Sequence, residues 1–266
     1  MTVLPPANIP GSVPRPNIAS FFTSNSDSVS QPKGNNDFSR GITADVQTLL
    51  RRRSANSARS RQTHLGPSEI GHPCDRQVAA KLAGLGDRSQ SDPWPSIVGT
   101  AVHAWLADAF AADDPVRWVT ENRLTPLPGH DGTADLYDAV NFAVLDHKLM
   151  GDTGMVKLRT QGPSRLYYIQ LLLYALGYVR AGRRVDHIGI IGYPRTGSTI
   201  QAIYTWSEPV TPASAAVLTG VVADLARRKA YAAQLSAGTR TLDSIPAVPD
   251  TCIFCPIRGM CADSSG

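Results

Sequence analysis

The chain has 266 residues, a length typical of one domain with an additional segment, and 42% of its residues are hydrophobic. It contains no apolar run of about 18 residues, which excludes a membrane-spanning helix, and residues 1–16 lack the basic and apolar regions of a secretory signal. We therefore expect a cytoplasmic protein with no membrane partner. The net charge of +4 is a weak indication of a polyanionic partner.

Residues 1–60 are rich in Pro, Ser, Asn and Gly, and their apolar residues follow no regular period. Such a segment cannot bury enough apolar surface to offset the entropy lost on ordering, so we expect a flexible, largely disordered tail. A short helix over residues 43–53 is compatible with the spacing of Val46, Leu49 and Leu50. Five arginines fit either a nucleic-acid backbone contact or a solvated linker: Arg51, Arg52, Arg53, Arg59 and Arg61.

Residues 61–266 carry the periodic patterns of one folded domain. In chain order the patterns predict helices over 74–82 and 97–110, strands over 116–125, 130–139 and 142–149, a helix over 164–180, strands over 185–193 and 199–206, and a helix over 212–235. The expected fold class is α/β (α+β), with a mixed central β-sheet flanked by helices.

Charged residues stand at the end of an otherwise apolar strand. In Val144-Leu145-Asp146-His147-Lys148 the two-residue period of a strand places Asp146 and Lys148 on one face. The preceding strand carries Asp135, which approaches Asp146 if the two strands form a hairpin. Two close carboxylates repel each other unless a divalent cation lies between them. An ordinary Asp–Lys salt bridge or an exposed strand edge remains the alternative for these residues taken alone.

Polar residues also stand on the two helices that flank these strands. His103 follows Gly99 by one turn on the earlier helix, where a packed or capping histidine is the alternative to a ligand. Gln170 and Tyr174 are four residues apart on the later helix and therefore share one face, which is otherwise built from Leu and Ile. An ordinary amphipathic face is the alternative reading of that pair.

Taken together, these motifs resemble the PD-(D/E)XK nuclease superfamily. Gly-x-x-x-His on a helix, Gly-x-x-Asp on a strand, Asp-x-Lys on the next strand and Gln-x-x-x-Tyr on a helix follow the order of RecB-like exonucleases, including the CRISPR-associated RecB-type family and its phage relatives. The resemblance covers about residues 68–261. The Pro-Asp of the superfamily name is absent, because Ala134 precedes Asp135. The resemblance implies a restriction-endonuclease-like core and a DNA exonuclease acting on single-stranded DNA or DNA ends.

The resemblance also assigns roles to the motif residues. Asp135 and Asp146 offer hard oxygen ligands suited to Mg²⁺ or Mn²⁺, and His103 and the backbone carbonyl of His147 would complete the set. Lys148 would orient or deprotonate the attacking water, Gln170 would position Lys148 or the phosphate, and Tyr174 would position the DNA. The alternative is a non-catalytic or partner-dependent DNA-binding subunit, for example a trimming factor in CRISPR spacer acquisition with a protein partner.

Basic residues after the active strand fit a path for DNA. Lys157, Arg159 and Arg165 lie in or next to a glycine-containing segment, residues 151–162, which we expect to be a loop that either contacts DNA or merely connects two elements. The later cluster Arg227-Arg228-Lys229 is expected to be a solvated helix face.

The chain contains four cysteines, one before the first core helix and three near its end: Cys74, Cys252, Cys255 and Cys261. The last three have C-x₂-C-x₅-C spacing, which is compatible with a zinc site. The arrangement of one cysteine before the histidine helix and three after the core resembles the iron–sulfur site of RecB-like exonucleases. That resemblance implies a structural [4Fe–4S] cluster held by all four thiolates, with zinc as the alternative.

Overall fold

The protein is described from a computed structural model, which covers residues 37–56, 64–86, 92–197 and 199–261. Helix α1 (Asp37–Ala55) contains no buried residue and presents its apolar side chains to solvent. It begins at Asp37 and ends at Ala55, so it is longer than the helix predicted over 43–53. The remainder of the predicted tail, residues 1–36 and 57–60, lies outside the described residues.

Five strands form one mixed sheet in the order of the sequence. They are β1 (Trp118–Leu127), β2 (His130–Asp138), β3 (Ala143–Met150), β4 (His187–Pro194) and β5 (Tyr204–Pro209). Neighbouring strands are antiparallel except β3 and β4, which are parallel over eight residue pairs, from Ala143↔His187 to Met150↔Pro194. A parallel pair needs a crossover connection, and two helices supply it, α5 (Asp152–Gln161) and α6 (Arg165–Arg180).

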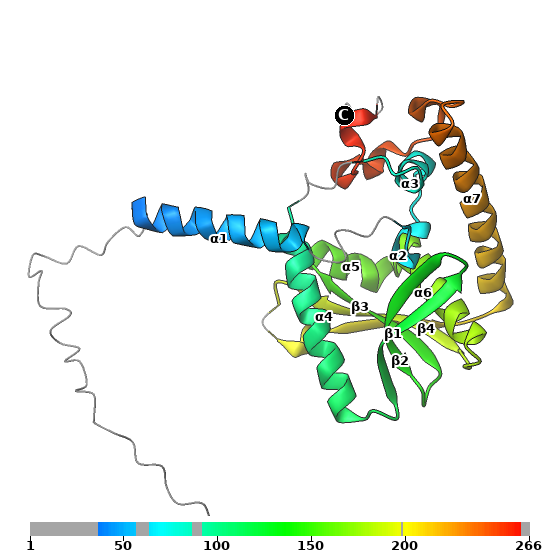
Figure 1. The fold of residues 1–266 in the computed structure, drawn as a ribbon. Helices are drawn as coiled ribbons and strands as arrows, with labels where there is room; N and C mark the ends of the chain where they lie inside the picture. Colours follow the sequence, from blue (N-terminus) through cyan, green and yellow to red (C-terminus); the bar gives the residue numbers. More distant parts are fainter. Residues whose placement is uncertain (1–36, 57–63, 87–91, 198, 262–266) are drawn as a thin grey trace, which may run out of the picture. The chain divides into compact units, whose positions relative to one another are not determined.

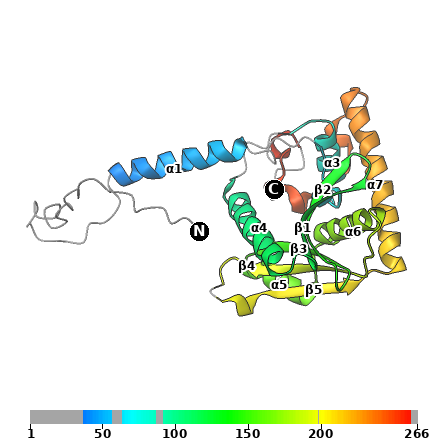
Figure 2. The same cartoon turned by 60° about the horizontal axis from the view of Figure 1, so that its bottom comes forward.

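The helices cover both faces of the sheet. Helix α4 (Trp94–Asp113) and helix α6 lie on opposite sides of the strands (Figure 2), and α7 (Pro212–Ser236) packs against α6 on the side away from the sheet. Buried residues of β2, β3, β4 and α6 form the main hydrophobic core, among them Val144, Ile188 and Leu171. The predicted α/β class with a mixed, helix-flanked sheet is confirmed. None of the helices in the described part of the chain is long and apolar enough to cross a membrane.

Two short helices before α4 and three 3₁₀ turns after α7 complete the described part of the domain. Helices α2 (Pro67–Ile70) and α3 (Asp75–Leu82) precede α4, and α3 packs against α7 (Figure 1). Three 3₁₀ turns follow α7: η3 (Leu242–Ser244), η4 (Pro249–Phe254) and η5 (Arg258–Met260). The N-terminal and C-terminal parts of the domain are therefore neighbours, although more than 150 residues separate Asp75 from its α7 partners.

Two predicted elements differ from the structure. Residues 151–162 were expected to be a loop, but Gly151 is followed by helix α5, which ends at Gly162 in the left-handed conformation with φ of 76°. Helix α5 buries Met155 and Leu158 against the sheet, and this packing outweighs the low helix propensity of its Thr and Gly residues. The strand predicted over 199–206 begins only at Tyr204, because η2 (Ile200–Ala202) occupies its first half.

The basic cluster 227–229 was expected to be a solvated helix face, and this prediction is wrong for Arg228. Its side chain is 5% exposed, and its guanidinium donates to Asp75 Oδ1 at 2.7 Å, to the Ile70 carbonyl at 2.8 Å and to the His72 carbonyl at 2.9 Å. Arg227 also contacts Asp75, at 3.1 Å, while Lys229 is exposed. The cluster therefore fastens α7 to the segment that begins α3.

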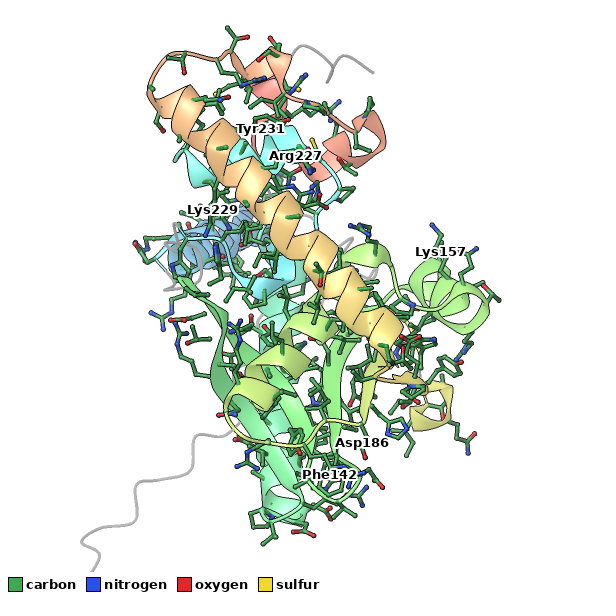
Figure 3. The ribbon with its side chains drawn as sticks, turned by 90° about the vertical axis from the view of Figure 1, so that its right-hand side faces the viewer. Phe142, Lys157, Asp186, Arg227, Lys229 and Tyr231 are labelled. Carbon is green, nitrogen blue, oxygen red and sulfur yellow. The ribbon has the colours of Figure 1, made fainter. Side chains whose placement is uncertain are left out.

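Asp138 organises the turn between β2 and β3. Its buried carboxylate accepts hydrogen bonds from the backbone N–H groups of Val140 and Asn141, from the Asn141 side chain and from the Arg117 guanidinium. Burial by itself opposes ionisation of Asp138, but these hydrogen bonds outweigh it and lower its pKa to about 2. At the far end of the same connection, the backbone N–H of Asp186 donates to the Phe142 carbonyl at 2.8 Å, and the two residues are neighbours in Figure 3.

We expect Asp138→Asn to lose stability in a pH-dependent way. A carboxylate whose folded pKa lies below its unfolded value stabilises the fold above the unfolded pKa, near 4, and this stabilisation is lost as pH falls toward the folded value. The difference in free energy of unfolding between wild type and Asp138→Asn should therefore be constant above about pH 5 and shrink between about pH 4 and 2. Denaturant titrations at several pH values measure it. A difference that is independent of pH would contradict the assigned hydrogen bonds.

Candidate active site

Strands β2 and β3 bring the predicted acidic residues to one place. The hydrogen-bonded pairs of these strands run from Asp138↔Ala143 to Leu136↔Leu145 and stop there, so Asp135 and Asp146 are the first residues beyond the ladder. The backbone N–H of His147 donates to Asp135 Oδ2 at 2.9 Å, which closes this end of the hairpin through a side chain. The predicted hairpin and the neighbouring positions of its two aspartates are therefore present.

Asp146 is held by two partners, one on its own strand and one on α6. It is 2% exposed, Gln170 Nε2 donates to its Oδ1 at 2.8 Å, and the Lys148 ammonium forms an ion pair with its Oδ2. Lys148 Nζ also lies 4.9 Å from the centre of the Tyr167 ring, a cation–π contact. Gln170 was expected to position Lys148 or a phosphate, and in the structure it positions Asp146.

The electrostatics of this pair follow from its burial. Complete burial raises the pKa of Asp146 to about 6, and the neighbouring carboxylate of Asp135 adds to this effect while Lys148 opposes it. Burial also disfavours the ammonium form of Lys148, but the two aspartates outweigh it and raise the Lys148 pKa. Near neutral pH the pair is therefore a buried carboxylate with a charged lysine beside it.

Asp135 lies next to His103 of α4. The two side chains are 3.4 Å apart, between Asp135 Oδ1 and His103 Nδ1. The hydrogen bond to Asp135 raises the pKa of His103 although burial opposes this, and His103 and Lys148 in turn lower the pKa of Asp135 against its own burial. A metal ion binds only the neutral imidazole, so its binding at His103 would require the loss of one proton from the charged ring.

The His147 side chain is turned away from Lys148, as strand alternation predicts. Its ring is 1% exposed, stacks on Phe110 of α4 at 5.4 Å, and places Nδ1 at 3.1 Å from the Tyr193 hydroxyl. Burial lowers the His147 pKa to about 4, so the ring is neutral. The ring lies beside that of His103, with 5.9 Å between the two ring centres, but it does not belong to a group of metal-binding side chains in the described residues. The backbone carbonyl of His147 stays the proposed ligand.

Glu121 of β1 joins this site, and the sequence analysis missed it. One ligand atom each of His103, Glu121 and Asp135 lie within 4.8 Å of one another, an arrangement that could hold a metal ion. Asp146 is not a member of this group. The hairpin register would have identified Glu121: β1 and β2 pair Thr120 with Leu136 and Asn122 with Ala134, so Glu121 stands opposite Asp135.

The other predicted residues lie in three different settings. Tyr174 is 5% exposed and belongs to the hydrophobic core, and its role in positioning DNA stays a prediction. Lys157 and Arg159 are on α5 and not in a loop: Lys157 extends outward from the helix (Figure 3), and Arg159 donates to the Ala202 carbonyl at 2.8 Å. Arg165 begins α6 and lies 3.7 Å from Asp224 of α7.

The four cysteines lie near the ends of the domain. Cys74 is the N-cap of α3, where its sulfur accepts from the backbone N–H of Gln77 at 3.5 Å, and Cys261 Sγ lies 2.9 Å from Arg76 Nη1. Burial raises the pKa of the Cys255 thiol, and the other three thiols add to this effect. Within the described residues, however, no three of these sulfur atoms come within 4.8 Å of one another. The thiols are not gathered into a compact ligand set, so the structure does not support the predicted cluster.

No protein-family model matches the sequence, and no curated protein matches it either. Three crystal structures resemble parts of the chain. An alkaline exonuclease from Laribacter hongkongensis shares 15% identity, with 46% of this chain and 62% of that chain covered and a TM-score of 0.36. The same exonuclease in complex with dAMP shares 15% identity, with 68% and 95% covered and a TM-score of 0.47.

A phage-related exonuclease from Haemophilus somnus 129PT shares 14% identity, with 62% of this chain and 82% of that chain covered and a TM-score of 0.44. The chain thus spans less than two thirds of the first of these structures. At such identities, and with every TM-score below 0.5, these likenesses carry no argument about the activity of this chain. The functional argument rests on the residues of the site.

Proposed function

We propose that the chain is a nuclease that hydrolyses DNA phosphodiester bonds with Mg²⁺ or Mn²⁺, and that it acts as an exonuclease on single-stranded DNA or DNA ends. The observation that carries the proposal is the junction of β2 and β3. There a buried Asp146–Lys148 pair adjoins an Asp135–His103 pair, at the point where the two strands cease to be hydrogen-bonded. Burying charged groups is costly even when they are paired, so a cluster of buried charges with shifted pKa values marks a candidate functional site.

The donor set fits a hard divalent cation. His103, Asp135 and Asp146 supply one nitrogen and several carboxylate oxygens, and the His147 carbonyl is the remaining proposed ligand. Such a cation polarises the scissile phosphodiester and lowers the pKa of a coordinated water. Lys148 offsets the negative charge that develops on the phosphate during attack, and Gln170 holds the Asp146 carboxylate in one orientation. In-line attack would leave a 5′-phosphate and a 3′-hydroxyl.

The experiment is a cleavage assay on single-stranded and duplex DNA, labelled at the 5′ end or the 3′ end, with Mn²⁺, Mg²⁺ or EDTA. We expect metal-dependent release of short products from one labelled end and none in EDTA. Binding of DNA without cleavage in any metal would favour the alternative, a DNA-binding subunit that needs a protein partner. Genomic association with recombination, repair, phage or CRISPR-adaptation proteins would then identify the pathway.

The [4Fe–4S] cluster of Cys74, Cys252, Cys255 and Cys261 stays a prediction. What supports it is that Arg76, two residues after Cys74, ties the start of α3 to the C-terminal segment through hydrogen bonds to the Ile245 and Asp243 carbonyls. The other three thiols also add to the raised pKa of Cys255. Cluster formation would require the sulfur atoms to approach a common centre. We expect Cys74→Ser to lose iron and acid-labile sulfide and to unfold at a lower temperature.

Iron, sulfide and zinc are measured on anaerobically purified wild type and on Cys74→Ser. The matched control is Ser68→Ala, which lies in the same N-terminal segment and removes no thiol. Stoichiometric zinc without sulfide, or full metal content in Cys74→Ser, would exclude a four-cysteine cluster. Because Cys74 lies far from Cys252 in the sequence, a local C-terminal zinc site would not need it.

A further inference from the structure

Glu121 occupies a position in the sheet that is unfavourable for a glutamate. It lies between the pairs Thr120↔Leu136 and Asn122↔Ala134, at the level of Asp135, and one oxygen of each carboxylate lies within 4.8 Å of the other. Its backbone also adopts a φ of 48° in the interior of a strand, a left-handed conformation that is uncommon for residues other than glycine. Both features are explained if a cation lies between the two carboxylates.

The third member of the group comes from another element. His103 belongs to α4, which packs across β1 and β2, and its ring nitrogen and the oxygens of Glu121 and Asp135 lie within 4.8 Å of one another. Nitrogen and two carboxylates from a helix and two strands are a typical donor set for Mn²⁺ or Zn²⁺. Asp146, the other proposed carboxylate ligand, is bonded to Gln170 and Lys148 and is not a member of this group.

We propose that Glu121 is a side-chain ligand of the divalent cation bound at His103 and Asp135. The proposal rests on the proposed metal dependence and adds to it a residue outside the nuclease motifs. The left-handed backbone at Glu121 interrupts the regular pairing of β1 with Asp135, and the strain is offset when the cation is bound. Because the cation binds the folded chain at these side chains, added Mn²⁺ should stabilise the fold.

The test measures Mn²⁺ binding to the EDTA-treated full chain, from the signal of free Mn²⁺ in electron paramagnetic resonance and by calorimetry. We expect Glu121→Gln to weaken Mn²⁺ binding by at least about tenfold, because it removes one anionic ligand. Asp135→Asn is the positive control. Asp131→Asn is the matched negative control, since Asp131 lies on the same hairpin but is paired with Arg123 and Thr125, and it should stay within about twofold of wild type.

A second variant separates ligation from folding. Glu121→Gly relieves the left-handed backbone, so in EDTA it should unfold at a higher temperature than wild type, yet gain less from added Mn²⁺. Wild-type Mn²⁺ affinity in either Glu121 variant, or a wild type that binds no Mn²⁺, would overturn the proposal. A wild type that binds Mn²⁺ through Glu121 but never cleaves DNA would refute the nuclease proposal alone.

Discussion

Replacing Asp146 or Lys148 should reduce DNA cleavage to background, by at least about 10²–10⁴-fold, while DNA binding stays near the wild-type level. Asp146→Ala removes a proposed metal ligand, and Lys148→Ala removes the ammonium group that is proposed to offset charge on the phosphate. Because Asp146 is buried between Lys148 and Gln170, Asp146→Asn is the better-matched variant: it keeps the volume and a hydrogen bond to Gln170. Turnover in Mn²⁺ and binding to single-stranded DNA are measured for each variant.

The control is the ion pair between Lys81 of α3 and Glu69 of α2, which lies outside the site. Lys81→Ala removes a lysine–carboxylate ion pair of similar chemistry and should leave cleavage within about twofold of wild type. Circular dichroism checks that every variant is folded. Full activity in Asp146→Asn or in Lys148→Ala would show that the β3 strand is not the active strand.

The sheet and its acidic hairpin were predictable because their signals are local. Alternating apolar residues identify β2 and β3, and the two-residue period places Lys148 and the His147 ring on different faces, as observed. Helix α6 was equally clear, since Ser164 provides an N-cap and Gly182 follows its end. The residues of these elements could be assigned without knowledge of any distant contact.

The features that were missed depend on tertiary contacts. Helix α5 is stabilised by the packing of Met155 and Leu158 against the sheet. The sequence pattern of this segment, which has a glycine at each end, does not reveal that packing. Glu121 becomes part of the site only through the β1–β2 register, which the sequence analysis did not work out. Arg228 was expected to be solvated because it belongs to a run of three basic residues. Its partners, Asp75 and the Ile70 carbonyl, lie more than 150 residues earlier in the sequence.

The contact of Arg228 with Asp75 links the two ends of the domain sequence. The buried guanidinium of Arg228 donates hydrogen bonds to Asp75 and to two backbone carbonyls of the segment before α3. A buried ion pair is not by itself stabilising, because removing both charges from water is costly. Removal of one partner, however, leaves the other charge buried and uncompensated, and that cost is large.

We therefore expect Asp75→Ala to lower the free energy of unfolding by about 3–5 kcal/mol, as measured by urea titration. Asp224→Ala is the matched control: Asp224 also pairs with Arg227 but is partly exposed, so its loss should cost less than about 1 kcal/mol. The double variant Asp75→Ala/Arg228→Met removes both charges and should regain at least about half of the loss, since an apolar side chain of similar length tolerates the buried site. If Asp75→Ala costs no more than Asp224→Ala, the Arg228 contact does not hold α7 to α3, and the packing of Leu225 and Val221 against Val78 must do so instead.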